Sequence, residues 1–264
     1  MNKLKLNYTS LSFLPILVCI PLGYQLINNI HFGGFKLFQE FLISAFNPKI
    51  DNEIIITVIK RLNETILIGF FSWLVSIIFG AIFGIISSNI FYKIFNIPNF
   101  FYRIIRFFLT IIRSIHEVVW GIILMQIYGI NFSIGIIAIC IPYIAVNSKV
   151  FAEQLETIDY KSFESINQIN APKFSSLLTL IWNPIINTFK NFGLYRLECS
   201  IRSTVILGLF GIGGIGTSIF LSFQTLNFRE LWTYLWSLAI LIILSELIFK
   251  KIKFNTTNTV SYTH

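Results

Sequence analysis

The amino-acid sequence predicts an all-α integral membrane protein with about six transmembrane helices. Three observations lead to this fold class: 55% of the residues are apolar, only 12% are charged, and the mean hydropathy is +0.75. Soluble domains contain about 25% charged residues, so this chain has about half the charge that a water-facing surface needs. The composition therefore excludes a soluble enzyme, a disordered chain and a disulfide scaffold.

Long charge-free runs locate the predicted spans, because a helix of about 20 apolar residues crosses a hydrocarbon core. The first predicted span covers 10–30, and it lacks the small-residue cleavage site of a signal peptide. The second covers 65–88, inside a run that contains no charged residue. The remaining four are predicted at about 107–128, 132–150, 203–228 and 231–249.

The basic residues predict the orientation of these spans. With a cytoplasmic amino terminus, most Lys and Arg residues outside the spans fall in cytoplasmic segments, so both termini are predicted to be cytoplasmic. We interpret the net charge of +8 in this way, and not as a sign of nucleic-acid binding. The predicted organisation is an N-terminal helix with an extracytoplasmic segment (1–59), a transmembrane domain (60–249) and a basic, polar cytoplasmic tail (250–264).

The longest predicted cytoplasmic connection, 148–200, has the pattern of two short helices. Asp159 is a candidate N-cap for a first helix over 160–169. The second is predicted between Pro172, which suits a first helical turn, and Pro184, which suits an end. Its apolar positions with amphipathic spacing are Phe174, Leu177, Leu178 and Ile181. Such a helix pair either docks a soluble partner or packs on the membrane surface.

Two pairs of opposite charges, each with a spacing of four residues, lie in or beside predicted spans. They are Arg113 with Glu117, and Glu198 with Arg202. Residues at this spacing share a helix face, and charges in a membrane face protein or a water-filled cavity. The pairs predict either ion pairs that fix helix packing or, for the two arginines, an electrostatic path for an anion. His116 is predicted to form a packing hydrogen bond, with a proton relay as the alternative.

A glycine-rich segment lies inside the charge-free run 203–228. Its glycines are Gly208, Gly211, Gly213, Gly214 and Gly216. The spacing fits the letters of a dinucleotide fingerprint, but a membrane span excludes the strand and helix that this fingerprint requires. The glycines are predicted either to pack helices closely or to break the fifth span beside a translocation path. Gly80 and Gly84, in the second span, predict close helix packing.

No motif in the sequence predicts a catalytic or metal site in this chain. No GxxxxGK[ST] loop occurs, so the chain has no usual means of holding ATP. Cys19, Cys140 and Cys199 have neither CxxC nor His-paired spacing and predict isolated thiols. We therefore expect no catalytic residue, no metal and no cofactor bound by this chain.

Several stretches resemble one known family. These stretches are 62–65, 112–120, 151–159, 195–202, 204–208 and 211–216. They are similar to permease subunits of type I ABC importers and, within them, to the phosphonate permeases. Residues 112–120 resemble the stretch Leu-Arg-Ala-Ile-Pro-Glu-Leu-Val-Trp of that subfamily, with His116 in place of proline. The resemblance covers about 60–249, which it identifies as a type 1 ABC permease domain.

The cytoplasmic signature of that family is degraded in this chain. The family has Glu-Ala-Ala, three residues, Gly, nine residues and Ile-x-Leu-Pro; here Asn170 replaces the glycine, and Pro184 comes one residue late. The resemblance implies a coupling-helix loop for an ATPase between spans four and five, with Glu164 as the main contact. The coupling residues that it implies are Glu164, Ser165, Asn170, Ala171 and Pro172.

The resemblance implies a permease subunit, not an enzyme, of an ATP-driven importer in the bacterial cytoplasmic membrane. Its substrate would be a phosphonate, phosphite or a related phosphorus oxyanion, moved by alternating access. The implied partners are ATPase subunits that use ATP and Mg²⁺, an extracytoplasmic binding protein, and a second permease copy, identical or paralogous. The residues expected in the translocation path or in helix ion pairs are Arg113, His116, Glu117, Trp120, Glu198 and Arg202. A secondary transporter or channel for a small anion, without an ATPase, is the alternative.

Overall fold

The computed structural model describes residue 21 and residues 32–158 and 172–260, in which no β-strand occurs. The predicted all-α fold class is confirmed. The chain divides into two compact units, Met1–Pro48 and Lys49–His264, so residue 60, the predicted start of the transmembrane domain, lies inside a helix of the second unit. In the first unit, α3 covers Phe32–Ser44, and Ser44 Oγ donates to Glu40 O at 2.8 Å.

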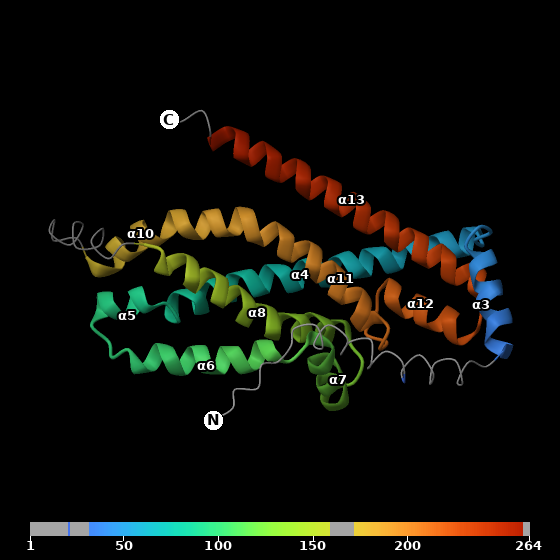
Figure 1. Cartoon of the computed structure of the whole chain (residues 1–264), viewed down its shortest axis with the longest axis horizontal. Coiled ribbons are helices and arrows are strands. Elements are labelled where there is room, and N and C mark those ends of the chain that lie inside the picture. The colour runs from blue at the N-terminus through green and yellow to red at the C-terminus, as the bar shows by residue number, and fades with distance from the viewer. Residues whose placement is uncertain (1–20, 22–31, 159–171, 261–264) are drawn as a thin grey trace, which may run out of the picture. The chain divides into compact units, whose positions relative to one another are not determined.

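The second unit is a set of packed helices (Figure 1). In chain order they are α4 (Asn52–Ile86), α5 (Asn89–Phe95), α6 (Phe100–Ser114), α7 (Glu117–Tyr128), α8 (Phe132–Glu156), α10 (Lys173–Thr188), the π-helix η1 (Phe189–Gly193), α11 (Leu194–Gly208), α12 (Ile215–Gln224) and α13 (Phe228–Val260). The largest interface joins α4 to α8.

The α4–α8 interface is close because glycines face it. A Cβ atom on Gly80 would lie 2.5 Å from Asn147 Cβ, and one on Gly84 would lie 2.6 Å from Phe151 Cβ. Small residues let helix backbones approach in this way, and polar side chains then bond across the interface. Asn147 Nδ2 donates to Ser76 Oγ at 3.3 Å. The packing role predicted for Gly80 and Gly84 is confirmed.

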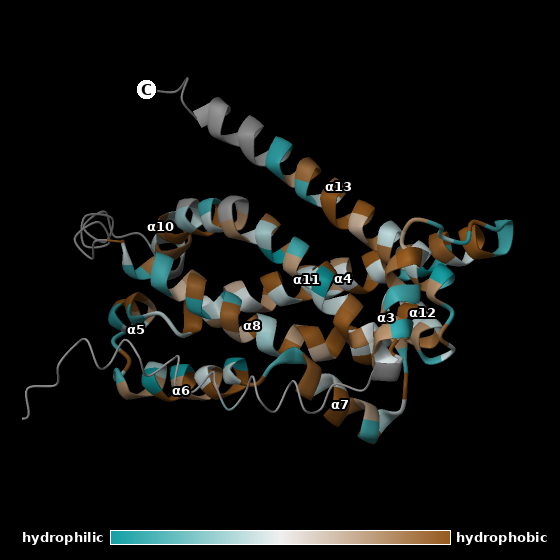
Figure 2. Cartoon of the chain, turned by 45° about the vertical axis from the view of Figure 1, so that its right-hand side comes forward, coloured by the Kyte–Doolittle hydropathy of each residue, from teal (hydrophilic) through white to brown (hydrophobic). Residues whose placement is uncertain are grey.

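Three described helices, α4, α8 and α13, are long and apolar enough to cross a membrane, and the bent α6–α7 pair makes a possible fourth span. α8 and α13 contain the predicted fourth and sixth spans, and α4 contains the predicted second span except for its last two residues, 87 and 88. The first predicted span lies outside the described residues except for residue 21. The chain is therefore a multi-pass membrane protein. Hydrophobic colouring runs along much of α13 (Figure 2), of whose span only 17% is buried.

The third predicted span is not one helix. The axes of α6 and α7 are bent by 85° at a break over Ile115 and His116. Ile115 has an extended backbone, and His116 begins α7 as its N-cap, where Nδ1 accepts from Val118 N–H at 3.4 Å. The prediction of a continuous helix over 107–128 is wrong because hydropathy does not detect a local change of backbone conformation.

The fifth predicted span is also interrupted. It begins within α11, which ends at Gly208; residues 209–214 form a turn, and α12 begins at Ile215. Gly211, Gly213 and Gly214 have φ angles of 93°, 123° and 76°. Only glycine adopts such angles readily, so these residues end the helix. The glycines thus break the fifth span, which was one of the two alternatives predicted for this segment.

Helices α10 and α11 follow one another through η1. Pro184 lies inside α10 and does not end it, so that boundary prediction is wrong. Leu177 and Ile181 are buried in a cluster with Ile90, Ile94 and Leu155 of α5 and α8, so this chain covers part of the apolar face predicted for docking. The first predicted helix of the pair, over 160–169, and Asp159 lie outside the described residues.

Candidate functional site

A cavity of about 410 Å³ lies among α6, α7, α8 and α11. We call it the arginine cavity, because three arginines line it. Its lining residues are Arg113, Ser114, Ile115, His116, Glu117, Pro142, Tyr143, Val146, Arg196, Cys199, Arg202 and Ser203. The cavity thus brings together four of the predicted path residues from three helices and the break before α7.

The α6–α7 break separates the first predicted ion pair. Because Arg113 ends up on α6 and Glu117 on α7, the two do not share a helix face, and no ion pair between them occurs in the described residues. Arg113 Nη2 donates instead to Thr110 Oγ1 at 3.3 Å. Glu117 Oε1 accepts from Ser203 Oγ at 2.6 Å. The predicted Arg113–Glu117 pairing is therefore wrong, although both residues line the same cavity.

A hydrogen-bond chain crosses the cavity wall from Tyr143 to Glu117. Tyr143 OH lies 2.8 Å from Ser203 Oγ, which in turn donates to Glu117. A serine hydroxyl has a single proton, and a carboxylate only accepts, so Tyr143 must be the donor in the first bond. The Glu117 side chain is 13% exposed. It is thus a largely buried acid held in position by α8 and α11.

Arg196 is the functional residue that the sequence analysis missed. Its guanidinium lies 3.7 Å from the centre of the Tyr143 ring, a stacking geometry typical of arginine. Its Nε and Nη2 atoms are buried and have no hydrogen-bond partner in the described part of the chain. A signal was present in the sequence, since Arg196, Cys199 and Ser203 follow the i, i+3, i+7 spacing of one helix face.

The π-helix η1 sets the direction of Arg196. A π turn adds one residue to a helix and so rotates all later side chains by about 100°. Trp73 Nε1 donates to Gly193 O, the last residue of η1, at 2.7 Å. This bond from α4 fixes the π turn three residues before Arg196.

The second predicted ion pair is present: Arg202 Nη2 donates to Glu198 Oε1 on the same face of α11. Arg202 is about half exposed, whereas Glu198 is mostly buried. Trp120, also predicted in this region, packs against the buried cluster of α4, α8 and α11, and its Nε1 is buried without a partner in the described residues. Neither Glu198 nor Trp120 lines the arginine cavity.

The glycine turn is anchored by α4. Gly214 N donates to Glu64 Oε2 at 3.1 Å, and Ile215 N donates to Thr65 Oγ1 at 2.9 Å. The free N–H groups at the start of α12 are therefore satisfied by side chains from another helix, as helix termini require. Glu64 also accepts from Arg61 Nη1 at 2.9 Å. Two stretches recognised separately in the sequence, 62–65 and 211–216, meet here.

Two other glycines serve close packing. A Cβ on Gly216 would lie 2.1 Å from Val205 O, and one on Gly208 would lie 2.7 Å from Gly213 O. Close packing therefore applies to Gly208 and Gly216, and the helix break applies to the other three glycines, whereas a place beside a translocation path stays a prediction.

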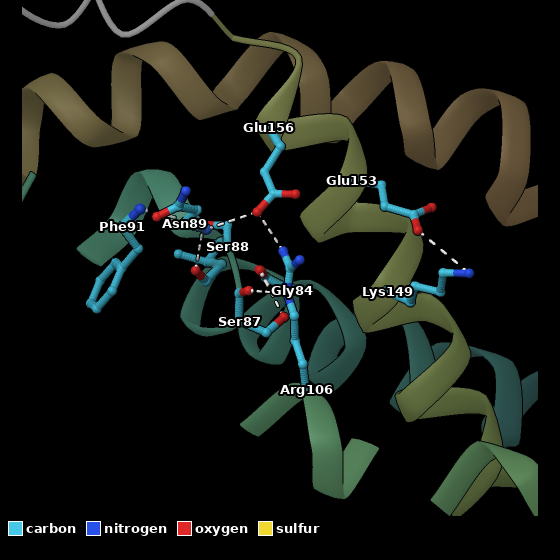
Figure 3. Close-up of polar contacts among 10 residues, drawn as sticks. Gly84, Ser87, Ser88, Asn89, Phe91, Arg106, Lys149, Glu153 and Glu156 are labelled. Carbon is cyan, nitrogen blue, oxygen red and sulfur yellow. Dashed lines mark hydrogen bonds and ion pairs between the residues drawn. The ribbon is translucent and has the colours of Figure 1, made fainter. Parts of the chain in front are cut away.

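A second polar cluster joins the middle of α6 to residues at the ends of α4, α5 and α8 (Figure 3). Arg106 on α6 donates from Nε to Ser87 O at 2.8 Å and from Nη2 to Glu156 Oε1 at 2.5 Å. Glu156, at the end of α8, also accepts from Asn89 N at 3.0 Å. We call Ser87, Asn89, Arg106 and Glu156 together the Arg106 clasp. An exposed pair, Lys149 with Glu153, lies beside it on α8.

Glu156 of the Arg106 clasp comes shortly before the segment that the resemblance implies couples to an ATPase. Glu164, Ser165, Asn170 and Ala171 lie outside the described residues, so their predicted contacts stay predictions. Pro172 is described and exposed, immediately before α10. Residues 157 and 158, the last described before that segment, follow Glu156 directly. In the described residues, no group of three His, Cys, Asp or Glu side chains could hold a metal ion.

The fold is that of an ABC importer permease. A chain of the MetNI methionine ABC transporter, in an inward-facing conformation, superposes with a TM-score of 0.67 over 77% of this chain and 98% of that chain. The sequence identity is 16%, so the likeness concerns the fold alone. No family model matches the chain.

Several curated relatives with similar sequences are named as permeases for phosphite, phosphate or phosphonate. The phosphite transport system permease protein PtxC of Stutzerimonas stutzeri is 26% identical over 49% of this chain and 47% of its own length. The phosphate-import permease protein PhnE of Mycolicibacterium smegmatis is 25% identical over 47% of this chain and 23% of its own length. The chain thus spans about half, or less, of these relatives. They are transport subunits and not enzymes, which agrees with the resemblance noted in the sequence.

Proposed function

We propose that the chain is the permease subunit of an ATP-driven importer for a phosphorus oxyanion: phosphonate, phosphite or phosphate. The observation that carries the proposal is the arginine cavity, which occurs in a chain with an importer-permease fold. Arg113, Arg196 and Arg202 line it against one acid, Glu117. A cavity with such an excess of positive charge attracts an anion and holds it through charge-assisted hydrogen bonds.

The broken helices support a role in translocation. Membrane transporters commonly bind substrate where helices are interrupted, because the freed backbone groups need water or ligand as partners. The α6–α7 break contributes Ser114, Ile115 and His116 to the lining of the cavity. The cavity therefore combines an interrupted helix with three arginines, of which Arg196 has two buried nitrogen atoms.

The proposed assembly has two permease chains, identical or paralogous, two ATPase subunits and an external binding protein. ATP and Mg²⁺ belong to the ATPase, which contacts the segment around Glu164 on the cytoplasmic side. We propose a bacterial cytoplasmic membrane as the location, with both termini in the cytoplasm, as the basic residues predict. Alternating access then moves the anion, and nucleotide shifts the equilibrium through its different contacts with the two states.

Uptake by the native assembly tests this proposal. The tagged chain is extracted from its own membrane, its co-purifying proteins are identified by mass, and the assembly is reconstituted in liposomes. We expect an ATPase and a binding protein to be recovered, and uptake of phosphite or methylphosphonate that requires both ATP and the binding protein. Uptake that persists without ATP but follows an ion gradient would instead support a secondary transporter.

A further inference from the structure

We propose that the arginine cavity binds a phosphorus oxyanion that still carries one acidic proton, and that Glu117 selects this form over sulfate. Arg196 binds the unprotonated oxygens, while Glu117 accepts a hydrogen bond from the P–OH group. This inference rests on the proposed function and adds the chemical form of the ligand and the residue that recognises it.

Among the described residues, no acidic side chain forms an ion pair with Arg196. Its Nε and Nη2 atoms are buried and have no partner among those residues, and stacking on Tyr143 holds the guanidinium plane. A buried cation without a partner is costly, and the side-by-side N–H groups of arginine match two oxygens of an oxyanion. Because Arg196 lines the cavity, a shift of its side chain toward a bound tetrahedral anion would give these two nitrogens their partners.

Glu117 adds a requirement that a cationic cavity alone would not impose. Its Oε1 accepts from Ser203, but its Oε2 receives no hydrogen bond from any described residue. The nearest candidate donor, His116 Nδ1, lies 3.5 Å away and already accepts from Val118 N–H. Tyr143 and Ser203 direct their protons along the chain toward Glu117, so neither offers one to a ligand. Glu117 thus keeps an acceptor oxygen for a ligand that brings a proton.

The candidate anions differ in whether they carry an acidic proton near neutral pH. Phosphate monoesters lose their second proton near pH 6, and phosphite, phosphate and alkylphosphonates likewise keep an acidic proton on part of the population near neutral pH. Sulfate has the same tetrahedral shape but no proton at that pH. A carboxylate repels a bare anion, and a site built around one hydrogen bond rejects an analogue that cannot form it. We expect phosphite to be preferred over sulfate by about 100-fold or more.

The test uses the full-length permease in lipid nanodiscs, titrated calorimetrically with sodium phosphite and with sodium sulfate. In Glu117→Gln the new amide offers an N–H donor to sulfate and keeps the side-chain volume, so the preference should fall to within a few fold of unity. Glu117→Asp retains the carboxylate and should retain the preference. Arg196→Gln should weaken the binding of both anions.

Glu198→Gln is the matched control. Glu198 is about as deeply buried as Glu117 and forms an ion pair with Arg202, but it does not line the cavity. Its substitution changes the net charge by the same amount, so a general charge effect would raise the affinity for both anions in both variants. Loss of selectivity in Glu117→Gln alone identifies the specific hydrogen bond.

Alkylation of Cys199 locates the binding in the cavity. Cys199 lines the cavity and is half-buried, whereas Cys140 is buried elsewhere. In the unmodified protein, phosphite should slow Cys199 alkylation severalfold, as measured by mass spectrometry, and sulfate should not. This readout needs no substitution, so it decides the proposal even if a variant does not fold.

Two results would overturn the inference: equal affinity of the unmodified protein for phosphite and sulfate, or an unchanged preference in Glu117→Gln. Absence of any anion binding would overturn it as well. ATP-dependent phosphite uptake together with any of these results would leave the proposed function intact. Lack of ATP-dependent uptake by the unmodified assembly would contradict the proposed function itself.

Discussion

The three arginines that line the arginine cavity differ in which groups already contact their guanidinium nitrogens. Arg113 donates to a threonine hydroxyl, Arg202 donates to the Glu198 carboxylate, and Arg196 has two buried nitrogens without a partner. Within the described part of the chain, the three arginines therefore form a graded set: Arg196 has two nitrogens without a partner, Arg113 is weakly engaged, and Arg202 is neutralised. We therefore expect anion uptake to fall by different amounts when different arginines of this set are replaced by an uncharged residue.

Substitution of Arg113 or Arg202 by alanine should lower phosphite uptake while the assembly stays intact. Loss of a charge-assisted hydrogen bond costs about 1.5–3 kcal/mol, which corresponds to a reduction of about tenfold or more. We expect the larger effect for Arg113→Ala, because the charge of Arg202 is already balanced by Glu198. Arg103→Ala, an exposed position on the same helix as Arg113, is the control. Normal uptake by both cavity variants would refute a role for these charges in transport.

Individual residues also show why part of the arginine cavity could not be predicted from the sequence. The pairs at a spacing of four residues were visible, but the spacing assumes an unbroken helix, which fails between Arg113 and Glu117. Arg196 has no opposite charge four residues away, so a search for ion pairs passes over it. Its significance comes from Tyr143, which is 53 positions distant and which only the folded chain places beneath it.

At the scale of the helices, uninterrupted segments could be predicted and interrupted ones could not. The spans within α4, α8 and α13 follow from charge-free runs, because average hydropathy depends only on composition. The breaks at 115–116 and 209–214 depend on backbone conformation at a few residues. His116 in the place of a family proline and the cluster of glycines were the available signals. His116 predicts only a hydrogen bond, and the glycines predict two alternatives, close packing or a helix break.

The close approach of α11 to α12 predicts a strong effect of a single methyl group. In Gly216→Ala the new Cβ would lie 2.1 Å from the Val205 carbonyl oxygen, and backbone cannot move aside cheaply. Overpacking of this kind costs about 1–3 kcal/mol. We expect a lower melting temperature and less monodisperse protein by size-exclusion chromatography. Gly34→Ala, where no atom lies within 4 Å, should leave both unchanged.

The Arg106 clasp predicts a defect in coupling. Arg106→Gln or Glu156→Gln removes the ion pair that ties α6 to the end of α8, next to the segment implied to contact the ATPase. We expect ATP hydrolysis by the reconstituted assembly to continue, while the anion transported per ATP falls severalfold. Lys149→Gln breaks the exposed pair on the same helix and is the control. An unchanged transport ratio in both clasp variants would assign the clasp to stability alone.

At the scale of the whole molecule, the structure and the sequence support different parts of the proposal. The arginine cavity comes from packing in the second unit, whereas the ATPase contact rests on the resemblance around Glu164. Glu164→Arg should uncouple ATP hydrolysis from uptake in the reconstituted assembly, because it reverses the charge at the expected contact. The ATPase should still co-purify. Normal coupling in this variant would count against the assignment of the contact to this segment.

The short helices α7 and α12 have a consequence for the energy of an ion in this membrane. With 12 and 10 residues, they rise about 18 and 15 Å, whereas a hydrocarbon layer is about 30 Å thick. Neither helix alone is long enough to cross the layer, so an end of either helix that lies within it needs protein or water as its hydrogen-bond partner. Water at such an end would raise the local dielectric constant and thin the low-polarity barrier. The Born energy that normally keeps a small multivalent ion out of a bilayer would then be reduced before any side chain touches the ion.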